Sequence, residues 1–538
     1  MEILTKLFFA LLVVSGLTPG TAMALRDSAS PAVNNSILFI ENSIDNEYFI
    51  TPASLDPRIS GANEWVRYDT GQRSLAYMGY VGWTAGTRNY VDMWIDNSPM
   101  QGTFQGIRCA SGTNCPAAGH IAGEGTDENG FYHAQVQGAG ITGGAYGFAS
   151  FAEGAYDYFR NMAVGGRETY ILNFCSTTIN YDYASGQRCK DQSSGTWRYQ
   201  NFTVNKTGHL SLESTNALQE IWIASDGTPN LSKDNGYCEL GTVSGTDGVI
   251  CKMVAYKLNQ TSVLNTSTYI RMYANTSVLG FTPAAASVRF SGDGQTWYNY
   301  SGTTTRYNNV FTNDGEYIYV YFSKVFLKNL VDRGINITQE QPFTFGFRNA
   351  VVVESGFYQF TPSLGLIFTP KEYGISIVPA GNSLSPSASG KIGDTSPIEM
   401  DYIVTVSGPR QADTITAQVI GDSTTVDGIP YCLFQSTQDG LSVAIPAYLQ
   451  YNGQQGNAIQ KRNSCGDPAI DMSNALWRQT PWDVNSSDDG SYFSTDLKLL
   501  FPMDDRRSML TLSGSDWEGV VSATGEIKVT ANWVGANK

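Results

Sequence analysis

Gly525-Glu-Ile-Lys-Val-Thr-Ala-Asn-Trp533, close to the C-terminus, alternates strictly between polar and apolar residues. Successive side chains of a β-strand point to opposite faces, so this period of two places Ile527, Val529, Ala531 and Trp533 on one face. The pattern predicts a half-buried strand. Two interpretations stay open: the strand closes a complete β-domain, or it borders an incomplete sheet that takes its missing neighbour from another chain.

The N-terminus has the organisation of a secretory signal peptide over residues 1–24. Lys6 precedes the apolar run 7–17, and Ala22-Met-Ala24 predicts cleavage after Ala24. The apolar run is shorter than the roughly 20 residues of a membrane-spanning helix, and no later stretch reaches that length. The sequence therefore predicts an exported, soluble mature chain.

The composition is that of an acidic, aromatic-rich β-protein. The chain has 538 residues and a formal net charge of −15, with 15% charged residues, 55 Gly and 30 Tyr. Glycine-rich turns and aromatic strands are typical of β-domains. Because no basic patch accompanies the negative charge, we expect no binding of nucleic acid or anionic lipid. The length corresponds to about three or four domains.

Eight cysteines fall into four near-neighbour pairs. In an exported chain an even number predicts disulfides, and sequential pairing is the favoured arrangement among about a hundred that eight cysteines allow. Zinc would need C-x-x-C spacings or clustered histidines, whereas His120, His133 and His209 are scattered. The predicted pairs are Cys109/Cys115, Cys175/Cys189, Cys238/Cys251 and Cys432/Cys465.

Two helices are expected in an otherwise β-rich chain. Apolar residues recur at steps of three and four from Phe148 to Met162, and Gly165-Gly166 ends the run. A shorter helix should begin at a Ser323 cap and end at Gly334. The start of the mature chain, residues 25–31, has no strand pattern, which predicts a loose tail.

The same order of elements follows each helix. An aromatic strand, a loop and a further strand come after both, which indicates two related β-domains at 25–215 and 216–370; chance similarity of aromatic strands is the alternative. Beyond residue 370, alternating strands at regular spacing predict a β-sandwich of immunoglobulin type over 371–538, with Cys432 and Cys465 bridged.

The sequence contains no recognisable catalytic or metal-binding motif. The G-x-S-x-G elbow, H-E-x-x-H and nucleotide-binding glycine patterns are all absent. We therefore expect neither enzyme activity nor a cofactor. The two carboxylates of a glycosidase meet only in space, so a secreted carbohydrate-active β-sandwich enzyme or a free lectin stays the alternative.

Aromatic and arginine side chains of the first domain are candidates for contact with a receptor, either a glycan or a protein. Tryptophans of a β-sandwich belong more often to the core than to a binding surface. The candidates are Trp65, Trp83, Arg88, Trp94 and Arg108.

Several stretches, in the same order, resemble the tip adhesins of alternative (alpha-class) chaperone–usher pili. The resemblance extends over nearly the whole mature chain. The stretches are Leu55-Asp-Pro-Arg58 with Gly61-Ala-Asn63 and Trp65, Arg188-Cys-Lys-Asp-Gln192 with Ser194-Gly195 and Trp197, Asp226-Gly-Thr-Pro229, Cys251-Lys-Met-Val254, Tyr402-Ile-Val-Thr405 with Ser407-Gly408, and the 525–533 strand.

This resemblance implies an all-β, non-enzymatic protein of tandem immunoglobulin-like sandwich domains with short helices. It implies two adhesive domains followed by a pilin-like domain that lacks one strand, with Ile527, Val529, Ala531 and Trp533 lining the donor-strand groove. The implied partners are a periplasmic pilus chaperone, an outer-membrane usher, a shaft pilin and an unidentified host receptor. The implied route runs through the periplasm to the fimbrium tip, where the protein mediates attachment and biofilm formation. A shaft pilin would instead carry an N-terminal donor extension, which residues 25–31 do not resemble.

Overall fold

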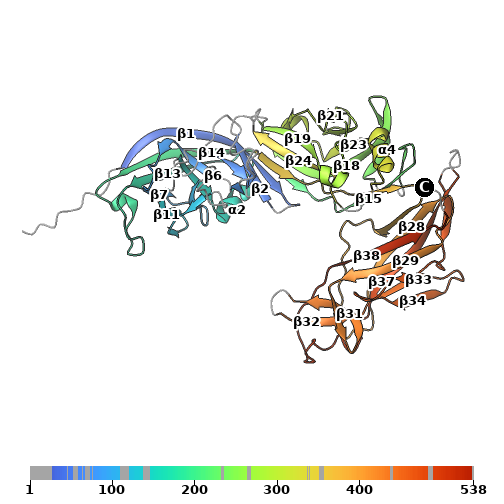
Figure 1. The fold of residues 1–538 in the computed structure, drawn as a ribbon. Coiled ribbons are helices and arrows are strands. Elements are labelled where there is room, and N and C mark those ends of the chain that lie inside the picture. Colours follow the sequence, from blue (N-terminus) through green and yellow to red (C-terminus); the bar gives the residue numbers. More distant parts are fainter. Residues whose placement is uncertain are drawn as a thin grey trace, which may run out of the picture.

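The computed structural model describes residues 27–44, 47–52, 59–62, 65–66, 73–74, 77–108, 120–136, 146–231, 236–262, 268–335, 337, 340–349, 357–436, 440–482 and 489–535. This part of the chain is almost entirely β-structure and contains three short α-helices. None of its helices has the length and apolar character needed to cross a membrane. Figure 1 shows two N-terminal β-units in line and a C-terminal sandwich set at an angle to them.

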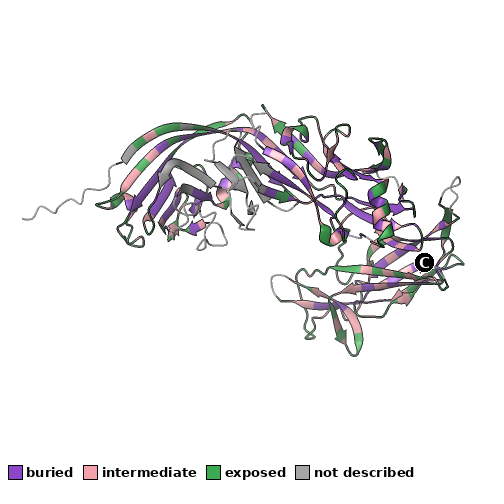
Figure 2. Ribbon diagram, turned by 45° about the horizontal axis from the view of Figure 1, so that its top comes forward, coloured by how far each residue is buried: buried purple, intermediate pink, exposed green. Residues whose placement is uncertain are grey.

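Two long strands join the first two units. β1 (Asp27–Asn42) pairs in parallel with β14 (Thr196–Glu213), and the end of β14 pairs antiparallel with β18 (Thr246–Gln260). Alternation divides β1 between two cores, because Ile37 and Phe39 pack in the first unit while Leu38 and Ile40 pack in the second. The two units thus have separate cores on one continuous 17-stranded sheet, and buried residues run along these strands through both (Figure 2).

The remaining strands of this sheet are mostly short. They are β2 (Glu47–Pro52), β3 (Ile59–Ala62), β6 (Tyr77–Thr84), β7 (Tyr90–Ile95), β8 (Phe104–Arg108), β9 (His120–Ala122), β10 (Gly125–Thr126), β11 (Gly130–Gln135), β12 (Tyr146–Phe151), β13 (Arg167–Thr177), β17 (Cys238–Val243), β20 (Val288–Ser291), β21 (Tyr298–Asn299) and β23 (Tyr317–Ser323).

The prediction of a loose N-terminal tail is wrong. β1 begins at Asp27, and its first residues pair with 197–200 of β14. The Gln200 side chain also donates a hydrogen bond from Nε2 to the Pro31 carbonyl at 2.8 Å. The segment lacks apolar alternation because backbone pairing with a long neighbouring strand, and not a buried face, holds it in place.

The first predicted helix begins later than its apolar spacing suggested. Residues 146–151 form β12, and the helix is α2 (Glu153–Asn161). Ala149 pairs with Ile107 of β8, so tertiary strand pairing overrides the helical spacing there. Phe151 and Phe159 still meet in the first core, with ring centroids 5.5 Å apart. The spacing identified which residues are buried but not their conformation.

The second unit forms around its own core with one capped helix. Ser323 Oγ accepts a hydrogen bond from the Phe326 amide at 3.3 Å, which opens α4 (Lys324–Asp332) as predicted. The other elements are α3 (Thr276–Leu279), a three-stranded sheet of β16 (Pro229–Leu231), β15 (Leu218–Ile223) and β26 (Gly365–Pro370), and a four-stranded sheet of β22 (Thr305–Arg306), β19 (Thr268–Ala274), β24 (Phe343–Asn349) and β25 (Phe357–Phe360). The short pair β4 (Trp65–Val66) and β5 (Arg73–Ser74), and the 3-10 turns Cys189–Asp191 and Tyr307–Asn309, complete the two units.

The third unit is a sandwich of two sheets with a small additional sheet. One layer contains β27 (Gly374–Pro379), β28 (Ile398–Gly408), β37 (Ser491–Phe501), β33 (Tyr448–Asn452), β34 (Ala458–Arg462) and β36 (Arg478–Pro481). The facing layer contains β35 (Ile470–Asp471), β29 (Thr414–Gly421) and β38 (Gly525–Asn532). Between them lies a third core that includes Val404, Ile415, Leu449 and Leu497. The additional sheet contains β30 (Ser423–Val426), β31 (Ile429–Gln435) and β32 (Ser442–Ile445).

Aromatic contacts fix the sandwich to the second unit. Trp222 of β15 is fully buried, and its ring lies 5.3 Å from that of Tyr492 in β37. Lys371 Nζ lies 5.0 Å from the ring of Trp482, and the Lys371 amide donates to the Ile223 carbonyl at 2.7 Å. The second and third units therefore meet through a packed interface as well as through the connecting chain.

The structure contains three of the four predicted sequential disulfides. Cys175–Cys189 fastens a loop onto the first unit, Cys238–Cys251 joins β17 to β18, and Cys432–Cys465 belongs to the third core. Cys109 and Cys115 lie outside the described residues.

Candidate functional site

The strand at 525–533 has a neighbour on one side only. β38 pairs antiparallel with β29 along its whole length, from Gly525 opposite Gly421 to Asn532 opposite Thr414. Within the described ranges no strand pairs with its other edge. Ile527, Val529 and Ala531 are half-buried against the third core and alternate with exposed residues. The half-buried strand is thus confirmed, and its one-sided pairing favours the interpretation of an incomplete sheet.

β27 faces β38 across the sandwich and is also an edge strand. In the part of the chain that the structure describes, it pairs with β28 alone. Ile375 and Ile377 point toward the third core but are only half-buried. We call the two unpaired edges and their half-buried side chains the open seam, comprising Ile375, Ile377, Ile527, Val529 and Ala531.

One end of the open seam is closed by the chain itself. The ring of Trp533 lies 5.4 Å from that of Tyr373, just before β27. Trp533 Nε1 donates to the Arg410 carbonyl at 3.0 Å, and Arg410 Nη2 donates to the Val534 carbonyl at 2.8 Å. Trp533, predicted to line the groove, therefore lies at its closed end.

The sequence reasoning did not include β27 in the site. Its signal is the short alternation of Gly374-Ile-Ser-Ile-Val-Pro379, in which Ile375 and Ile377 share one face. A run of two apolar residues is too short to distinguish an edge strand from a loop. Only the antiparallel pairing of this run with 402–407 places it opposite β38.

Such an open seam is chemically incomplete. An unpaired strand edge exposes backbone N–H and C=O groups and is a site of aggregation unless another segment covers it. A strand added to the free edge of β38 or of β27 would bond to that edge, and its alternate side chains would pack on the apolar side chains. Completing the burial of each half-exposed Ile or Val is worth on the order of 1 kcal/mol.

The residues predicted to contact a receptor are not brought together in one described site. Arg88 is exposed in a turn before β7, whereas Trp94 is only 8% exposed. Trp65, Trp83 and Arg108 belong to β4, β6 and β8, and their side chains lie outside the described residues. These assignments stay predictions.

Trp94 belongs to a row of aromatic rings in a small buried cluster, separate from the first core. Its ring centroid lies 5.8 Å from that of Trp197 and 6.5 Å from that of Tyr132. Lys190 Nζ lies over both tryptophans at 5.7 and 5.9 Å, and Arg188 lies over Tyr132 at 4.7 Å. The row was missed in the sequence because its rings come from the separate strands β7, β11 and β14 and its cations from residues 188–190.

A buried carboxylate fixes the Cys175–Cys189 loop beneath the row. Asp92 accepts hydrogen bonds from the Tyr181 hydroxyl and from the amides of Cys189 and His133, the last two at 2.7 and 2.8 Å. Burial raises the pKa of Asp92 above its ordinary value, while these hydrogen bonds oppose the shift. The carboxylate therefore holds the covering loop in place.

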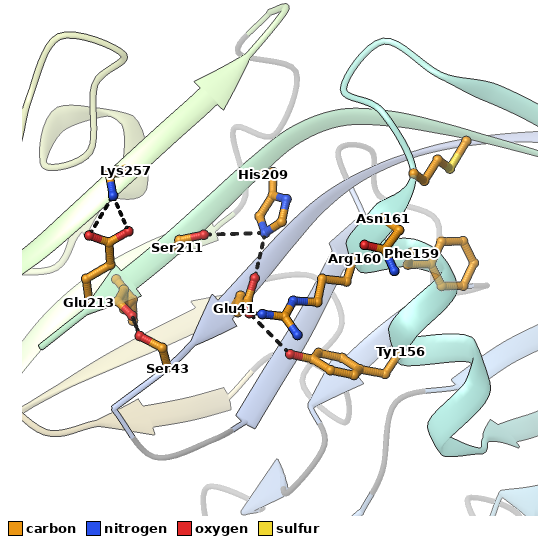
Figure 3. Close-up of polar contacts among 12 residues, drawn as sticks. Glu41, Ser43, Tyr156, Phe159, Arg160, Asn161, His209, Ser211, Glu213 and Lys257 are labelled. Atoms are coloured by element: carbon orange, nitrogen blue, oxygen red, sulfur yellow. Dashed lines mark hydrogen bonds and ion pairs between the residues drawn. The ribbon is translucent and has the colours of Figure 1, made fainter.

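A second polar cluster surrounds Glu41 near the junction of the first two units (Figure 3). Glu41 binds Arg160 Nη2 at 2.7 Å and His209 Nε2 at 3.1 Å. Ser211 Oγ lies 3.5 Å from the same His209 Nε2. A hydrolytic triad places serine and carboxylate on opposite ring nitrogens. Here both lie at Nε2, so this cluster does not have the geometry of a triad.

The opposite nitrogen of His209 faces a buried lysine. Lys206 Nζ lies 3.2 Å from His209 Nδ1 and donates to the carbonyls of Phe159, Arg160 and Met162 at 2.8, 3.0 and 2.8 Å. These carbonyls end α2, so the ammonium caps the helix C-terminus. Burial lowers the pKa of Lys206 to about 8. The cluster attaches α2 to β14 and β1.

The described side chains form no recognisable metal site. Across the described ranges, no three His, Cys, Asp or Glu side chains come together as ligands would. The acidic residues Glu124, Asp127 and Glu128 lie around the β10–β11 hairpin, where Asp127 Oδ1 accepts from the amides of Asn129 and Gly130. Asp127 therefore has a structural role in this turn.

Three family models match successive parts of the chain. The N-terminal domain of the E. coli common pilus adhesin EcpD matches residues 25–210, its middle domain 214–365 and its C-terminal domain 372–531. Curated relatives include the fimbria adhesins EcpD of Escherichia coli O6:H1 and O157:H7, each 36% identical over 550 residues. Those alignments cover 99% of this chain and 100% of each relative.

Solved structures with detectable similarity are far more distant. A mutant of CfaE, the CFA/I adhesin of enterotoxigenic E. coli, is 8% identical with a TM-score of 0.18, covering 95% of this chain and 94% of that one. The CsuC–CsuE chaperone–tip subunit complex of archaic Csu pili of Acinetobacter baumannii is 9% identical with a TM-score of 0.17. That alignment covers 59% of this chain and 99% of the other. These scores are too low to support an argument. By its family models and full-length relatives, the chain belongs to the EcpD family of fimbrial adhesins.

Proposed function

We propose that this chain is a fimbrial tip adhesin that attaches the cell to host cells or surfaces and promotes biofilm formation. Its C-terminal sandwich would join the pilus shaft by accepting a donor strand from the shaft pilin. The open seam carries this proposal, because two unpaired edges border half-buried apolar side chains there. Membership of the EcpD family supports the adhesive role.

We propose different roles for the three units. We assign adhesion to residues 25–215 and 216–370 and shaft attachment to 371–538. The signal peptide at 1–24 would direct the chain to the periplasm, where a pilus chaperone covers the seam. At the outer-membrane usher the shaft pilin would then replace the chaperone. The aggregation hazard of an uncovered edge supports the need for a chaperone.

The receptor would bind to the N-terminal units and is either a glycan or a protein. The exposed position of Arg88 supports a contact surface on the first unit, whereas Trp94 is buried. Trp65, Trp83 and Arg108 complete the set of candidates. We assign no catalytic role to any of these residues.

Thermal unfolding of the full chain tests the proposal. The N-terminal segment of the shaft pilin is fused after Lys538 through a flexible linker, and a control carries serine at the segment's alternating apolar positions. We expect only the unaltered segment to raise the midpoint of the sandwich, by about 10 °C, and to suppress aggregation, because it covers a free edge. Equal midpoints for all three proteins would mean that the sheet is already complete, and the proposal would be wrong.

A further inference from the structure

An open pocket of about 690 Å³ lies between α2, the turn at 99–101 and the start of β13. Sites for small ligands in proteins have volumes of about 300–1,000 Å³, so this pocket is large enough for one. We call it the α2 pocket. Its polar side chains are Gln101, Glu153, Asp157, Tyr158, Asn161 and Glu168.

The sides of α2 have different neighbours. Ala155 and Phe159 pack in the first core, and Arg160 pairs with Glu41 on a second side (Figure 3). A third side carries side chains spaced one helical turn apart, which share a face of the helix and line the α2 pocket. These are Glu153, Asp157 and Asn161. The side of α2 that contacts neither the core nor Glu41 is therefore polar and lines the pocket.

Close packing fixes the walls of the α2 pocket. A Cβ atom at Gly154 would lie 1.6 Å from the Gln101 carbonyl oxygen, so only glycine lets the 99–101 turn lie directly on the helix. The hydroxyl of the buried Tyr170 donates to the Tyr158 hydroxyl at 3.1 Å and holds that side chain in place. A ligand would therefore meet walls that need little ordering on binding, which favours affinity.

The α2 pocket is negatively charged. Its three carboxylates are those of Glu153, Asp157 and Glu168. Among the described residues that line it there is no Lys, Arg or His. The neighbouring Arg160 pairs with Glu41, and Arg167 donates to Asn34 Oδ1 at 3.2 Å. Over the described ranges, none of the three carboxylates forms an ion pair. The pocket would therefore repel a ligand that carries a carboxylate or sulfate group.

A neutral sugar matches this lining. Its hydroxyl groups donate hydrogen bonds, and hydrogen bonds to a carboxylate are roughly twice as strong as those between neutral groups. The Gln101 amide can donate and accept, and Tyr158 adds an aromatic ring that can pack on the apolar face of a sugar. A small cation would gain less, because pairs between exposed charges contribute little.

We propose that the α2 pocket binds a neutral glycan of the host receptor. The inference rests on the proposed function and adds to it the chemical class of the receptor and the place where it binds. The pocket belongs to the first unit, to which adhesion is assigned above. Carboxylates that accept hydrogen bonds from sugar hydroxyls would then select neutral glycans over acidic ones.

The test measures binding of the full chain to cultured epithelial cells. The test variant combines Asp157→Asn and Glu168→Gln, which keep the size of both side chains but remove their charge. The control combines Glu239→Gln and Glu340→Gln, two exposed positions of the second unit, and removes the same charge away from the pocket. The cells are used untreated, after sialidase, after protease, and after periodate, which cleaves the vicinal diols of sugars.

We expect the test variant to bind about tenfold more weakly than the unsubstituted chain, with the control unchanged, because its hydrogen bonds to sugar hydroxyls lose their charge. Periodate should abolish binding of the unsubstituted chain, whereas sialidase should leave it unchanged. If the test variant binds as tightly as the unsubstituted chain, the inference is wrong while the adhesive function stands. If the unsubstituted chain binds no cells, the adhesive function itself fails.

The same cells distinguish a neutral glycan from other occupants. We expect millimolar spermidine to leave the bound chain in place. Displacement by spermidine would identify a cationic ligand, and loss of binding after sialidase would identify an acidic glycan. Binding that survives periodate but not protease would identify a protein surface. Each of these three results would overturn the inference.

Discussion

At the scale of single residues, Lys206 is a buried charge held by several hydrogen bonds. It is 1% exposed, and its ammonium group serves three carbonyls of one helix end. A buried charge is costly unless its hydrogen bonds are satisfied, and here they are. His209 and Glu41 continue the network to β1.

Lys206→Met should lower the free energy of unfolding of the N-terminal units by about 2–3 kcal/mol. Methionine fills a similar volume but leaves the carbonyls that end α2 without a donor. The matched control is Lys257→Met, because Lys257 is 78% exposed and pairs with Glu213 at the surface. That change should cost less than about 1 kcal/mol. Urea unfolding at pH 7 measures both, and equal losses would contradict the assignment.

His209 should make the N-terminal units sensitive to mild acid. Burial, together with the neighbouring Lys206 and Arg160, lowers the pKa of His209, while Glu41 opposes the shift. As the pH falls through about 6.5, the unfolded chain therefore takes up a proton that the folded chain does not. The free energy of unfolding should fall accordingly, by at most about 1.4 kcal/mol per pH unit.

The variant His209→Gln keeps a donor for Glu41 but does not titrate. Urea unfolding at pH 7.5 and 5.5 should show a smaller acid loss for this variant than for the unsubstituted chain. The carboxylates other than Glu41 keep their surroundings in both proteins, so their contribution cancels in the comparison. Identical acid losses would show that His209 does not carry the effect.

At the scale of elements, β38 provides a test within a single strand. Val529→Lys places a charge on the face that lines the open seam, whereas Thr530→Lys places it on the exposed face. With the shaft pilin segment fused after Lys538, only Val529→Lys should abolish the rise in melting temperature, since an inserted strand would bury that charge. Calorimetry measures the midpoints. Loss of the rise in both variants would point to a general effect of charge on β38.

The elements also show how far local sequence can predict this fold. Strict alternation predicted β38, and the Ser323 cap predicted the start of α4, because both depend on neighbouring residues. Pairing with distant strands was not predictable. It places 27–31 in β1 and 146–151 in β12, and it sets β27 opposite β38. The β38 side of the open seam could therefore be predicted from the sequence. The β27 side could not, because it depends on pairing between distant strands.

At the scale of the whole molecule, the first two units should unfold together. β14 contributes Val204 to the first core and Leu210 to the second, on a strand without interruption. Calorimetry should show one transition for both units and another for the sandwich. Val204→Ala and Leu210→Ala should lower the same midpoint, while Val404→Ala in the third core should lower the other. Separate shifts for Val204→Ala and Leu210→Ala would mean that the two units are independent.

The shared strands also determine how the molecule bears load. β14 pairs with β13 over residues 196–205 and with β18 over residues 208–213, so one strand is hydrogen-bonded to both units. Pulling the units apart along their common axis would slide β14 lengthwise past its neighbours. The hydrogen bonds between β14 and a neighbouring strand would then have to break together. A force that separates two strands from one end breaks such bonds one after another. In an adhesin held by its receptor at one end and by its pilus at the other, the force of flow would load this junction along the strands. We expect other parts of the chain to unfold before this junction does.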